Sequence, residues 1–338
     1  MAVSPSKKIL EVIRSQQPQP SDEWSVAWYD QGDEWVGCYK GETLEEAAAQ
    51  SLYEIGSLTK VFTALLLAHE VTKGEVKLTD FVHSFFKEPL DGKEGKMTLE
   101  HLATHTSGLP RLPFRMIWRY WFPDPFFKKY KQNPYRTYGA RELFQDLRWY
   151  VDDPLSETSH YSNFGYALLG YILASKRKQS FDESITQAIS EPLGLKETRY
   201  PLPQELKSNL LKGFDPQGNP VPHWEFQVFA GAGALRSSIH DLLLFLKANL
   251  TPPTTMKEAI QLTHDVRIRE PGGLSVCLGW QANEKTGWFG HNGETAGFSS
   301  FMAFHSENQQ AIAVLCNRAG AGVDEIAKHL VEELSKGG

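Results

Sequence analysis

Ser57 and Lys60 stand three residues apart at the start of a strongly apolar stretch, residues 54–68. Residues at this spacing lie on one face of a helix, so the serine hydroxyl and the lysine amine would be neighbours. An adjacent amine can take the proton of a serine, and the N–H groups at a helix N-terminus favour developing negative charge. This pair therefore predicts a nucleophilic serine.

Spacing alone does not single out this pair, because Ser-x-x-Lys occurs four times: at Ser4/Lys7, Ser57/Lys60, Ser84/Lys87 and Ser175/Lys178. The context of Ser57 differs from that of the other three. A short strand leads to Gly56, and we expect the apolar helix that follows to run to about Thr72 and to end at Lys73-Gly74. Such a junction would hold a reactive serine at a fixed place.

A second group of polar residues, Tyr161-Ser162-Asn163, precedes another apolar helix and is the only Tyr-x-Asn in the chain. A tyrosine beside a lysine ammonium can have its pKa lowered from about 10, which suits it for proton transfer. Asn163 could donate to a substrate carbonyl or hold the lysine. It could also simply cap the helix.

A third group, His291-Asn292-Gly293, lies in a glycine-rich stretch between two expected strands, residues 288–292 and 298–304. Backbone N–H groups at a strand edge beside a glycine could form an oxyanion hole together with the N–H of Ser57. A tight hairpin between two core strands would explain the same residues without any catalytic role.

Other kinds of catalytic site are not indicated. No Gly-x-Ser-x-Gly is present, so the nucleophile elbow of α/β-hydrolases is excluded. His101 and His105 stand four apart but lack the glutamate of the zinc motif His-Glu-x-x-His. No cysteine pair has metal-ligand spacing, and no nucleotide-binding glycine pattern follows a strand. We expect no metal and no cofactor.

Composition indicates a globular protein that builds its own core: 338 residues, 41% hydrophobic, 22% charged, with a formal net charge of −6. Nothing in it suggests nucleic-acid binding, and the oligomeric state is not readable. Residues 1–17 predict an amphipathic helix rather than a secretory signal, and no run of 18 apolar residues predicts a membrane span. The expectation is a soluble, cytoplasmic protein with a small-molecule substrate. A chain whose export signal had been trimmed would look the same.

Strands are expected near both ends of the chain, and helices between them. The expected strands are residues 24–29, 34–39, 52–55, 275–283, 288–292, 298–304 and 311–317. The main expected helices are 98–105, 140–150, 163–177, 181–190, 239–250 and 323–334. This order predicts an α+β fold, with an antiparallel sheet built from both termini, flanked by helices, and an inserted mainly helical domain. The sheet domain would comprise 1–79 and 212–338, the helical domain 80–211, and the active site would lie at their junction.

Taken in order, the motifs resemble those of the serine β-lactamase and penicillin-binding protein superfamily, in its class C-related branch. That branch holds class C β-lactamases, DD-carboxypeptidases and β-lactamase-like carboxylesterases. The resemblance extends from about Trp24 to Leu334, and the matching segments are residues 57–60, 101–110, 161–163, 191–198, 231–237 and 291–293.

The resemblance implies a role for each motif. Ser57 would form the acyl-enzyme, and Lys60 and Tyr161 would share its activation, with either one as the general base. Asn163 would orient Lys60 and the substrate amide. The oxyanion hole would use the backbone N–H groups of Ser57 and Glu294.

The third motif departs from the Lys-Thr-Gly of class C β-lactamases, because His291, Asn292 and Gly293 take its place as substrate-binding residues. A literal Lys-Thr-Gly at Lys285 lies in a turn-like segment and lacks the trailing Gly-Phe-x-Ser-Phe, so it is rejected. Without a lysine, a fixed cation for a β-lactam carboxylate is in doubt. Arg318 could replace it, although a solvated surface arginine is the simpler interpretation.

The resulting hypothesis is a serine hydrolase that acts through an acyl-enzyme on β-lactam amides or related esters and amides. A DD-carboxypeptidase type of penicillin-binding protein and a carboxylesterase are alternatives. A non-catalytic, ligand-sensing penicillin-binding member is the alternative of another class. The aromatic segment 110–138 could form a wall that suits an apolar acyl group, or be an irregular packed loop.

Overall fold

The computed structural model describes residues 5–43, 45–46, 50–86, 95–121 and 133–334. Its main element is a nine-stranded antiparallel sheet in the order β3-β2-β1-β13-β12-β11-β10-β9-β8. These strands are β3 (Glu45–Glu46), β2 (Asp33–Lys40), β1 (Glu23–Asp30), β13 (Gln310–Cys316), β12 (Ser299–His305), β11 (Trp288–Glu294), β10 (Gln281–Asn283), β9 (Leu274–Val276) and β8 (Ile268–Arg269).

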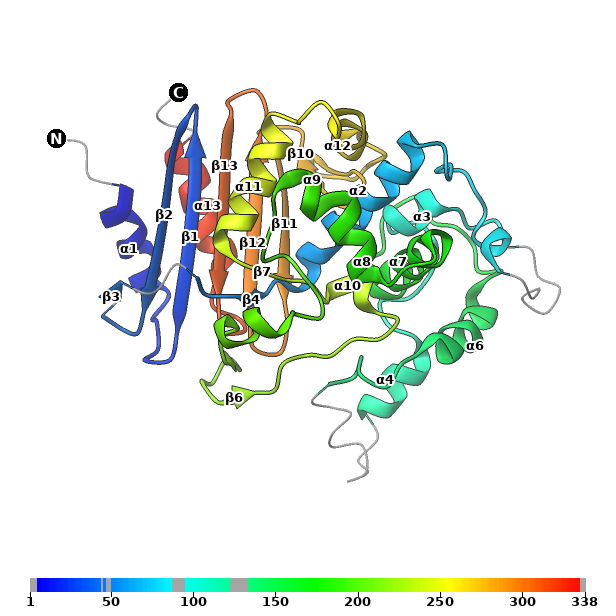
Figure 1. Ribbon diagram of the computed structural model, residues 1–338, viewed down its shortest axis with the longest axis horizontal. Coiled ribbons are helices and arrows are strands. Elements are labelled where there is room, and N and C mark those ends of the chain that lie inside the picture. Colours follow the sequence, from blue (N-terminus) through cyan, green and yellow to red (C-terminus); the bar gives the residue numbers. More distant parts are fainter. Residues whose placement is uncertain (1–4, 44, 47–49, 87–94, 122–132, 335–338) are drawn as a thin grey trace.

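The two ends of the chain meet at the centre of this sheet, where β1 pairs with β13 (Figure 1). Side chains alternate between the two faces of a strand, and the two core clusters follow this period. On β13, Ile312 and Val314 pack in one core cluster, whereas Ala313 and Leu315 pack in the other. Both faces of the sheet are therefore covered.

Helices from the chain ends cover one face, and helices from the interior of the sequence cover the other (Figure 1). The first face carries α1 (Pro5–Ser15) and α13 (Val323–Leu334), and the second carries α11 (Ile239–Leu250) and α2 (Thr59–Thr72). Helix α2 is buried along nearly its whole length. The residues at the N-terminal end of α2 therefore lie deep in the molecule.

The middle of the chain is mainly helical among the residues described. It contains α3 (Leu99–Ala103), α4 (Phe114–Trp121), α6 (Ala140–Tyr150), α7 (Asn163–Arg177), α8 (Phe181–Ile185), the π-helical turn η4 (Thr186–Ser190) and α9 (Glu191–Leu193). Further elements are the 3-10 turns η1 (Gly56–Leu58), η2 (Val82–Phe85) and η5 (Gln204–Asn209), the helices α10 (Ala230–Gly233) and α12 (Lys257–His264), and two small sheets, β4 (Tyr53–Glu54) with β7 (Arg236–Ser237) and β5 (Gly213–Phe214) with β6 (Pro220–Val221).

The predicted α+β architecture with an antiparallel sheet from both termini is confirmed, and so are the helices at 140–150, 163–177, 239–250 and 323–334. The single strand expected at 275–283 is wrong, because the chain turns back at Gly279, whose φ is +77°, and forms β9 and β10. The strand expected at 52–55 is a two-residue β4 outside the main sheet.

Helices α4 and α12 were not predicted from the sequence. In α4 half of the eight residues are aromatic, and aromatic residues have little intrinsic helix preference. The rest of the aromatic segment, 122–132, lies outside the described residues. The division into two domains remains a prediction. Within the described residues, no helix is both long and apolar enough to cross a bilayer.

Candidate active site

Ser57 lies in η1, the tight turn between β4 and the start of α2. The turn packs against the backbone of β11, and Gly56 makes this approach possible. Its φ is +49°, and a Cβ built on it would lie 2.9 Å from the backbone nitrogen of Glu294. Only glycine suits such a position. The predicted sequence of strand, glycine and helix therefore brings the serine against the third motif.

Lys60 lies one turn further along, and its side chain is completely buried. Its Nζ is 2.9 Å from Ser57 Oγ and donates to the carbonyl oxygen of Ala232 at 2.6 Å. Burial lowers the pKa of Lys60 well below its usual value, and the positive charge of Arg111 lowers it further. The amine beside Ser57 is therefore biased toward its neutral form.

The small residues of α10 allow the carbonyl of Ala232 to reach Lys60. A Cβ built on Gly231 would lie 2.9 Å from the Cα of Gly170 in α7. The two helices therefore meet backbone to backbone, and α10 lies close to α2. A run of glycine and alanine permits such a close backbone approach because it carries little or no side chain.

Tyr161 reaches the same point from the loop before α7. Its ring centroid is 4.8 Å from Lys60 Nζ, and its hydroxyl shares a hydrogen bond with Ser57. Burial raises the pKa of Tyr161 to about 12, although Ser57 and Arg111 both act to lower it. The lowered pKa expected for this tyrosine is therefore wrong: desolvation by burial exceeds the combined effect of the Ser57 hydrogen bond and the Arg111 charge.

Asn163 makes no hydrogen bond to Lys60, whose Nζ is hydrogen-bonded to Ser57 Oγ and Ala232 O. It is the first residue of α7, its backbone N–H donates to Arg111 O at 3.1 Å, and its buried Oδ1 has no hydrogen-bond partner among the described residues. The cap of α7 is Ser162, whose side chain accepts from the N–H of Gly165. The role of orienting Lys60 that the resemblance implied for Asn163 is therefore not accompanied by a hydrogen bond between the two side chains.

The third motif lies within β11, and its side chains alternate between the two faces of the sheet. His291 is buried on the face of Tyr161, with the two ring centroids 6.3 Å apart, whereas the Asn292 side chain donates to Asp324 of α13 at 3.3 Å. A Cβ built on Gly293 would lie 2.9 Å from the nitrogen of Ser57. The backbones of Gly293 and Glu294 therefore adjoin the turn that carries Ser57.

Two buried histidines near Tyr161, His291 and His105, are neutral at pH 7. Burial lowers the pKa of His291 to about 4, and the nearby Lys60 lowers it too. Burial and the same lysine hold the pKa of His105 well below its usual value.

His105 is a part of this site that the sequence analysis did not assign to it. Its ring packs at a tilt of 34° against the ring of Tyr161, with centroids 4.5 Å apart, and its Nδ1 accepts from the backbone N–H of Ser162 at 3.0 Å. It thereby fixes the loop that carries Tyr161. His101, in contrast, forms a capping box with Thr98, the N-cap residue of α3. Within the described residues, no group of His, Cys, Asp or Glu could hold a metal ion.

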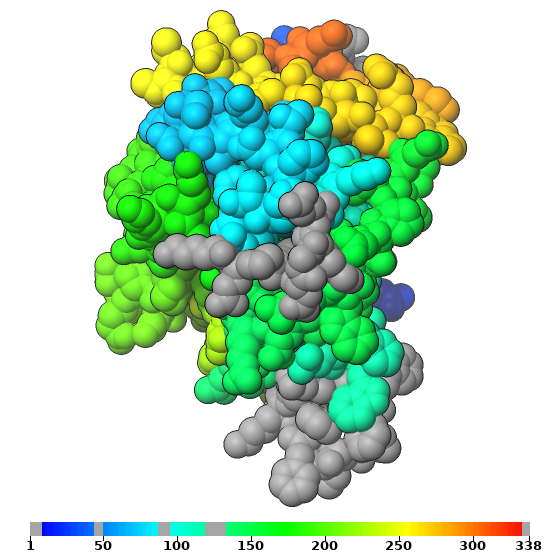
Figure 2. Space-filling model, turned by 90° about the vertical axis from the view of Figure 1, so that its right-hand side faces the viewer, coloured from blue at the N-terminus to red at the C-terminus, as the bar shows by residue number. Residues whose placement is uncertain are grey.

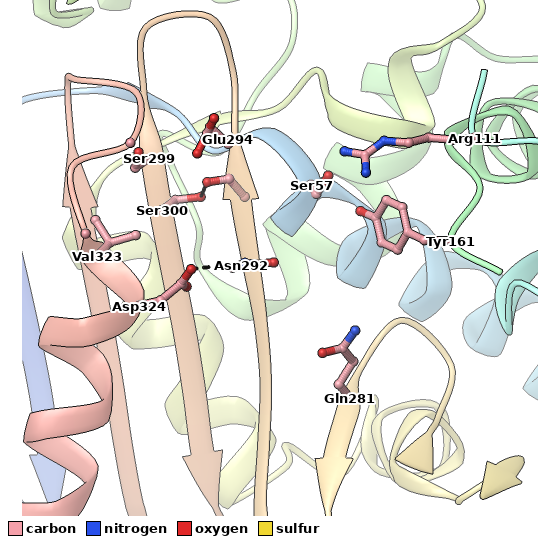
Figure 3. A pocket seen from close by; sticks show the side chains of 13 residues that line it. Ser57, Arg111, Tyr161, Gln281, Asn292, Glu294, Ser299, Ser300, Val323 and Asp324 are labelled. Atoms are coloured by element: carbon pink, nitrogen blue, oxygen red, sulfur yellow. Dashed lines mark hydrogen bonds between the residues drawn. The ribbon is translucent and has the colours of Figure 1, made fainter. Parts of the chain in front are cut away.

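A cavity of about 580 Å³ opens in front of Ser57. Figure 3 shows Ser57, Arg111 and Tyr161 on one side of it and α13 with Asp324 on the other, with Asn292 and Glu294 of β11 between them. Arg111 is exposed, and its guanidinium carbon lies 5.5 Å from the centroid of the Tyr161 ring. Sequence reasoning missed this arginine, whose signal was its place just after residues 101–110.

Two further candidates lie away from the cavity. Lys285 is in the exposed turn between β10 and β11, so its rejection agrees with the structure. Arg318 is neither a cation of the cavity nor a solvated surface residue, which corrects both interpretations. Its Nε donates to both carboxylate oxygens of Asp22 at 3.0 Å, and the two side chains are 8% and 0% exposed.

The family model described as Beta-lactamase matches residues 24–335, nearly the whole chain. The chain belongs to the beta-lactamase family. This confirms the superfamily that the ordered motifs indicated.

The protein flp of Staphylococcus aureus (strain MW2) is 28% identical over 298 residues, which cover 84% of this chain and 56% of flp. The chain therefore spans little more than half the length of flp. A beta-lactamase of Providencia stuartii is 23% identical over 318 residues, covering 83% of this chain and 78% of that protein.

Among solved structures, the beta-lactamase/D-alanine carboxypeptidase of Pseudomonas syringae superposes with a TM-score of 0.80 at 22% identity, covering 96% of this chain and 98% of that one. A class C beta-lactamase mutant superposes with a TM-score of 0.79 at 21% identity, covering 98% and 99%. This beta-lactamase family member therefore has the class C type of fold.

Proposed function

We propose that this beta-lactamase family member is a serine hydrolase that forms an acyl-enzyme on Ser57. The observation that carries the proposal is the distance of 2.9 Å between Lys60 Nζ and Ser57 Oγ inside a buried site at the base of a cavity. A nucleophile within hydrogen-bond reach of a base is the arrangement that covalent catalysis requires.

In the acylation step, Ser57 Oγ attacks the substrate carbonyl and its proton passes to a base. The pKa values favour Lys60 for this role: its pKa is lowered, so more of the amine is neutral, whereas Tyr161, with a pKa of about 12, is a neutral phenol at pH 7. Tyr161 then donates its proton to the leaving group and recovers one from Lys60.

Charge on the carbonyl oxygen would be stabilised by the backbone N–H groups of Ser57 and Glu294. The close packing of the η1 turn against β11 supports this assignment, because it brings both peptide units to the same end of the cavity. Fixed backbone donors need no reorganisation as the charge develops. In the second half of the reaction, water attacks the carbonyl carbon of the acyl ester and gives a proton to the same base. The base then returns this proton to Ser57 Oγ as the ester bond breaks.

Within this class, we propose that uncharged carboxylic esters are better substrates than β-lactams. Two features of the cavity wall on the side of residues 291–293 support this. The position of the lysine is taken by His291, which is neutral at pH 7 because burial lowers its pKa to about 4. The cavity wall there also includes Glu294 and Asp324. On that side a β-lactam carboxylate would meet acidic groups, whereas Arg111, a cation of the cavity lining, lies on the opposite side beside Tyr161.

Intact-mass spectrometry after incubation with a penicillin and, separately, with an activated ester tests the acyl-enzyme. We expect an adduct on the wild-type chain and none on Ser57→Ala. The absence of any Ser57-dependent adduct, together with no turnover of either substrate, would refute the proposal.

One assay of nitrocefin, a D-Ala-D-Ala peptide and a short p-nitrophenyl ester, side by side, tests the substrate preference. The proposal expects the largest kcat/KM for the ester. A larger value for the peptide would instead favour a DD-carboxypeptidase, and a larger value for nitrocefin a β-lactamase. A long-lived adduct without measurable release would favour a ligand-sensing, penicillin-binding protein.

A further inference from the structure

Ser300 is a fully buried residue of β12 to which the proposed mechanism gives no role. Its side chain lies at the wall of the cavity, beside the end of β11 that carries Glu294 (Figure 3). Its Oγ donates to Ile55 O at 2.8 Å and has Gly293 O as a second acceptor at 3.3 Å. One hydroxyl therefore joins the segment that leads into η1 to the strand that packs against it.

Each of these two carbonyl groups adjoins a donor of the candidate oxyanion hole. Gly293 O belongs to the same peptide unit as the N–H of Glu294. Because a peptide unit is planar, a contact that fixes its oxygen also fixes the direction of its N–H. Ile55 is the N-cap residue of the tight turn that carries the N–H of Ser57. Ser300 therefore acts on both donors through the backbone.

The hydroxyl reaches Ile55 because residue 293 has no side chain. Gly293 and Ser300 are opposite each other in the register of β11 and β12, and the side chains of opposite residues point to the same face of a sheet. A Cβ built on Gly293 would lie 2.5 Å from Ser300 Oγ and 2.2 Å from Ile55 O. The hydrogen bond therefore needs both a glycine at position 293 and a hydroxyl at position 300.

Backbone hydrogen bonds do not make this connection. In the part of the chain that the structure describes, the backbone groups of residues 55–58 bond to Leu235, to one another and to the start of α2, and none of them bonds to the backbone of β11. The spacing between η1 and β11 therefore depends on packing and on side chains.

A second side-chain contact ties the same two segments together. Glu54, which precedes Ile55, is hydrogen-bonded to the side chain of Thr295, which follows Glu294, and both side chains are buried. Ile55 O also has the N–H of Leu58 as a donor, at 3.2 Å. Loss of the hydroxyl at position 300 should therefore shift the turn and leave the region folded.

We propose that Ser300 is a positioning residue for acyl transfer, whose hydroxyl sets the spacing and direction of the N–H groups of Ser57 and Glu294. This inference rests on the function proposed above. Oxyanion donors act on the charge that develops in the transition state rather than on the bound substrate. The hydroxyl of Ser300 should therefore affect kcat and leave KM nearly unchanged.

Steady-state hydrolysis of a short p-nitrophenyl ester and single-turnover acylation compare the wild type with Ser300→Ala. We expect kcat and the acylation rate constant to fall about 10- to 100-fold with KM within about 2-fold, since a displacement of about 1 Å costs on the order of 10²-fold. Phenylboronic acid forms a tetrahedral adduct with a nucleophilic serine and resembles the transition state. Its Ki should therefore rise by about the same factor as kcat falls.

Ser184→Ala on α8 is the matched control. Ser184 is also fully buried, and its Oγ donates to a backbone carbonyl oxygen, that of Ser180, at 2.9 Å. Helix α8 belongs to the mainly helical middle of the chain, which forms most of the face shown in Figure 2. This variant loses a comparable hydrogen bond and should keep the kcat and the Ki of the wild type. Circular dichroism establishes that both variants fold, and a single-turnover rate constant does not depend on the fraction of molecules that are folded.

Acylation of Ser300→Ala at the rate of an active wild type would overturn this inference and leave the proposed function standing. A loss confined to KM, an unchanged Ki for phenylboronic acid, or an equal fall of kcat in Ser184→Ala would do the same. Absence of a Ser57 adduct on the wild type would instead refute the proposed function, and this inference with it.

Discussion

Replacing Gly293 by alanine should disable acylation while leaving the protein folded. A Cβ at this position would lie 2.2 Å from Ile55 O, 2.5 Å from Ser300 Oγ and 2.9 Å from the nitrogen of Ser57. An ordinary carbon contact is longer, so β11 and the η1 turn must separate by about 1 Å. The separation falls between the two N–H groups that we assign to the oxyanion hole.

The magnitude follows from that displacement. A misplacement of about 1 Å in a catalytic geometry costs on the order of 10²-fold in rate, and loss of one oxyanion donor about 10²- to 10³-fold. Overpacking costs about 1–3 kcal/mol of stability. With an unfolding entropy of about 2.1 cal/mol/K per residue, a chain of 338 residues should lose about 1–4 °C in Tm.

The assay is single-turnover acylation of Ser57, followed by rapid quench and intact mass, with the thermal midpoint measured in parallel. Gly290→Ala is the matched control on the same strand, because its new Cβ would lie no closer than 3.4 Å to a neighbouring atom, the Cβ of Ala303. We expect this control to acylate within about 2-fold of the wild type. Acylation of Gly293→Ala at the wild-type rate, or an equal loss in Gly290→Ala, would refute the oxyanion assignment.

Three further predictions concern stability and proton transfer. Arg318→Met should lower the free energy of unfolding by about 3–5 kcal/mol, because it leaves the buried carboxylate of Asp22 without its partner; acylation per folded molecule should persist, and a lost rate at unchanged Tm would contradict us. Burial lowers the pKa of His264 to about 4 from 6.5, so the unfolded chain binds the proton first as pH falls, and stability from this residue is lost from about 6.5 toward 4. His264→Gln should flatten the Tm profile over that range, and an unchanged slope would count against this assignment. Lys60→Met should reduce the acylation rate by about 10²-fold or more, and Tyr161→Phe should do so less for esters with good leaving groups; equal losses for activated and unactivated esters would argue against Tyr161 as the leaving-group donor.

Much of the fold could be predicted because local patterns decided it. The apolar runs of β1 and β13, the apolar length of α2 and the helical patterns of α6 and α7 each extend over consecutive residues, so they are visible in the sequence. The missed turn at Gly279 lies inside an apolar run that resembles one strand. Its positive φ fits the close packing of this residue on α2, where a Cβ would lie 2.7 Å from the Cβ of Ala64. Such packing is invisible to a local pattern.

In the candidate active site, too, some features are visible in the sequence and others depend on tertiary contacts. The sequence by itself predicts Ser57, Lys60 and Tyr161 as the reactive groups, because their residue types and order match a nucleophile and its proton carriers. Only the tertiary structure decided which of these side chains is biased toward its neutral form. Burial sets the pKa of Lys60 below its usual value and that of Tyr161 above it, and desolvation depends on neighbours from α7, α10 and β11. It also showed that Arg318 pairs with Asp22, that Arg111 is at the cavity, and that Asn163 does not hold Lys60. These contacts join residues far apart in the chain, and no spacing along the sequence records them.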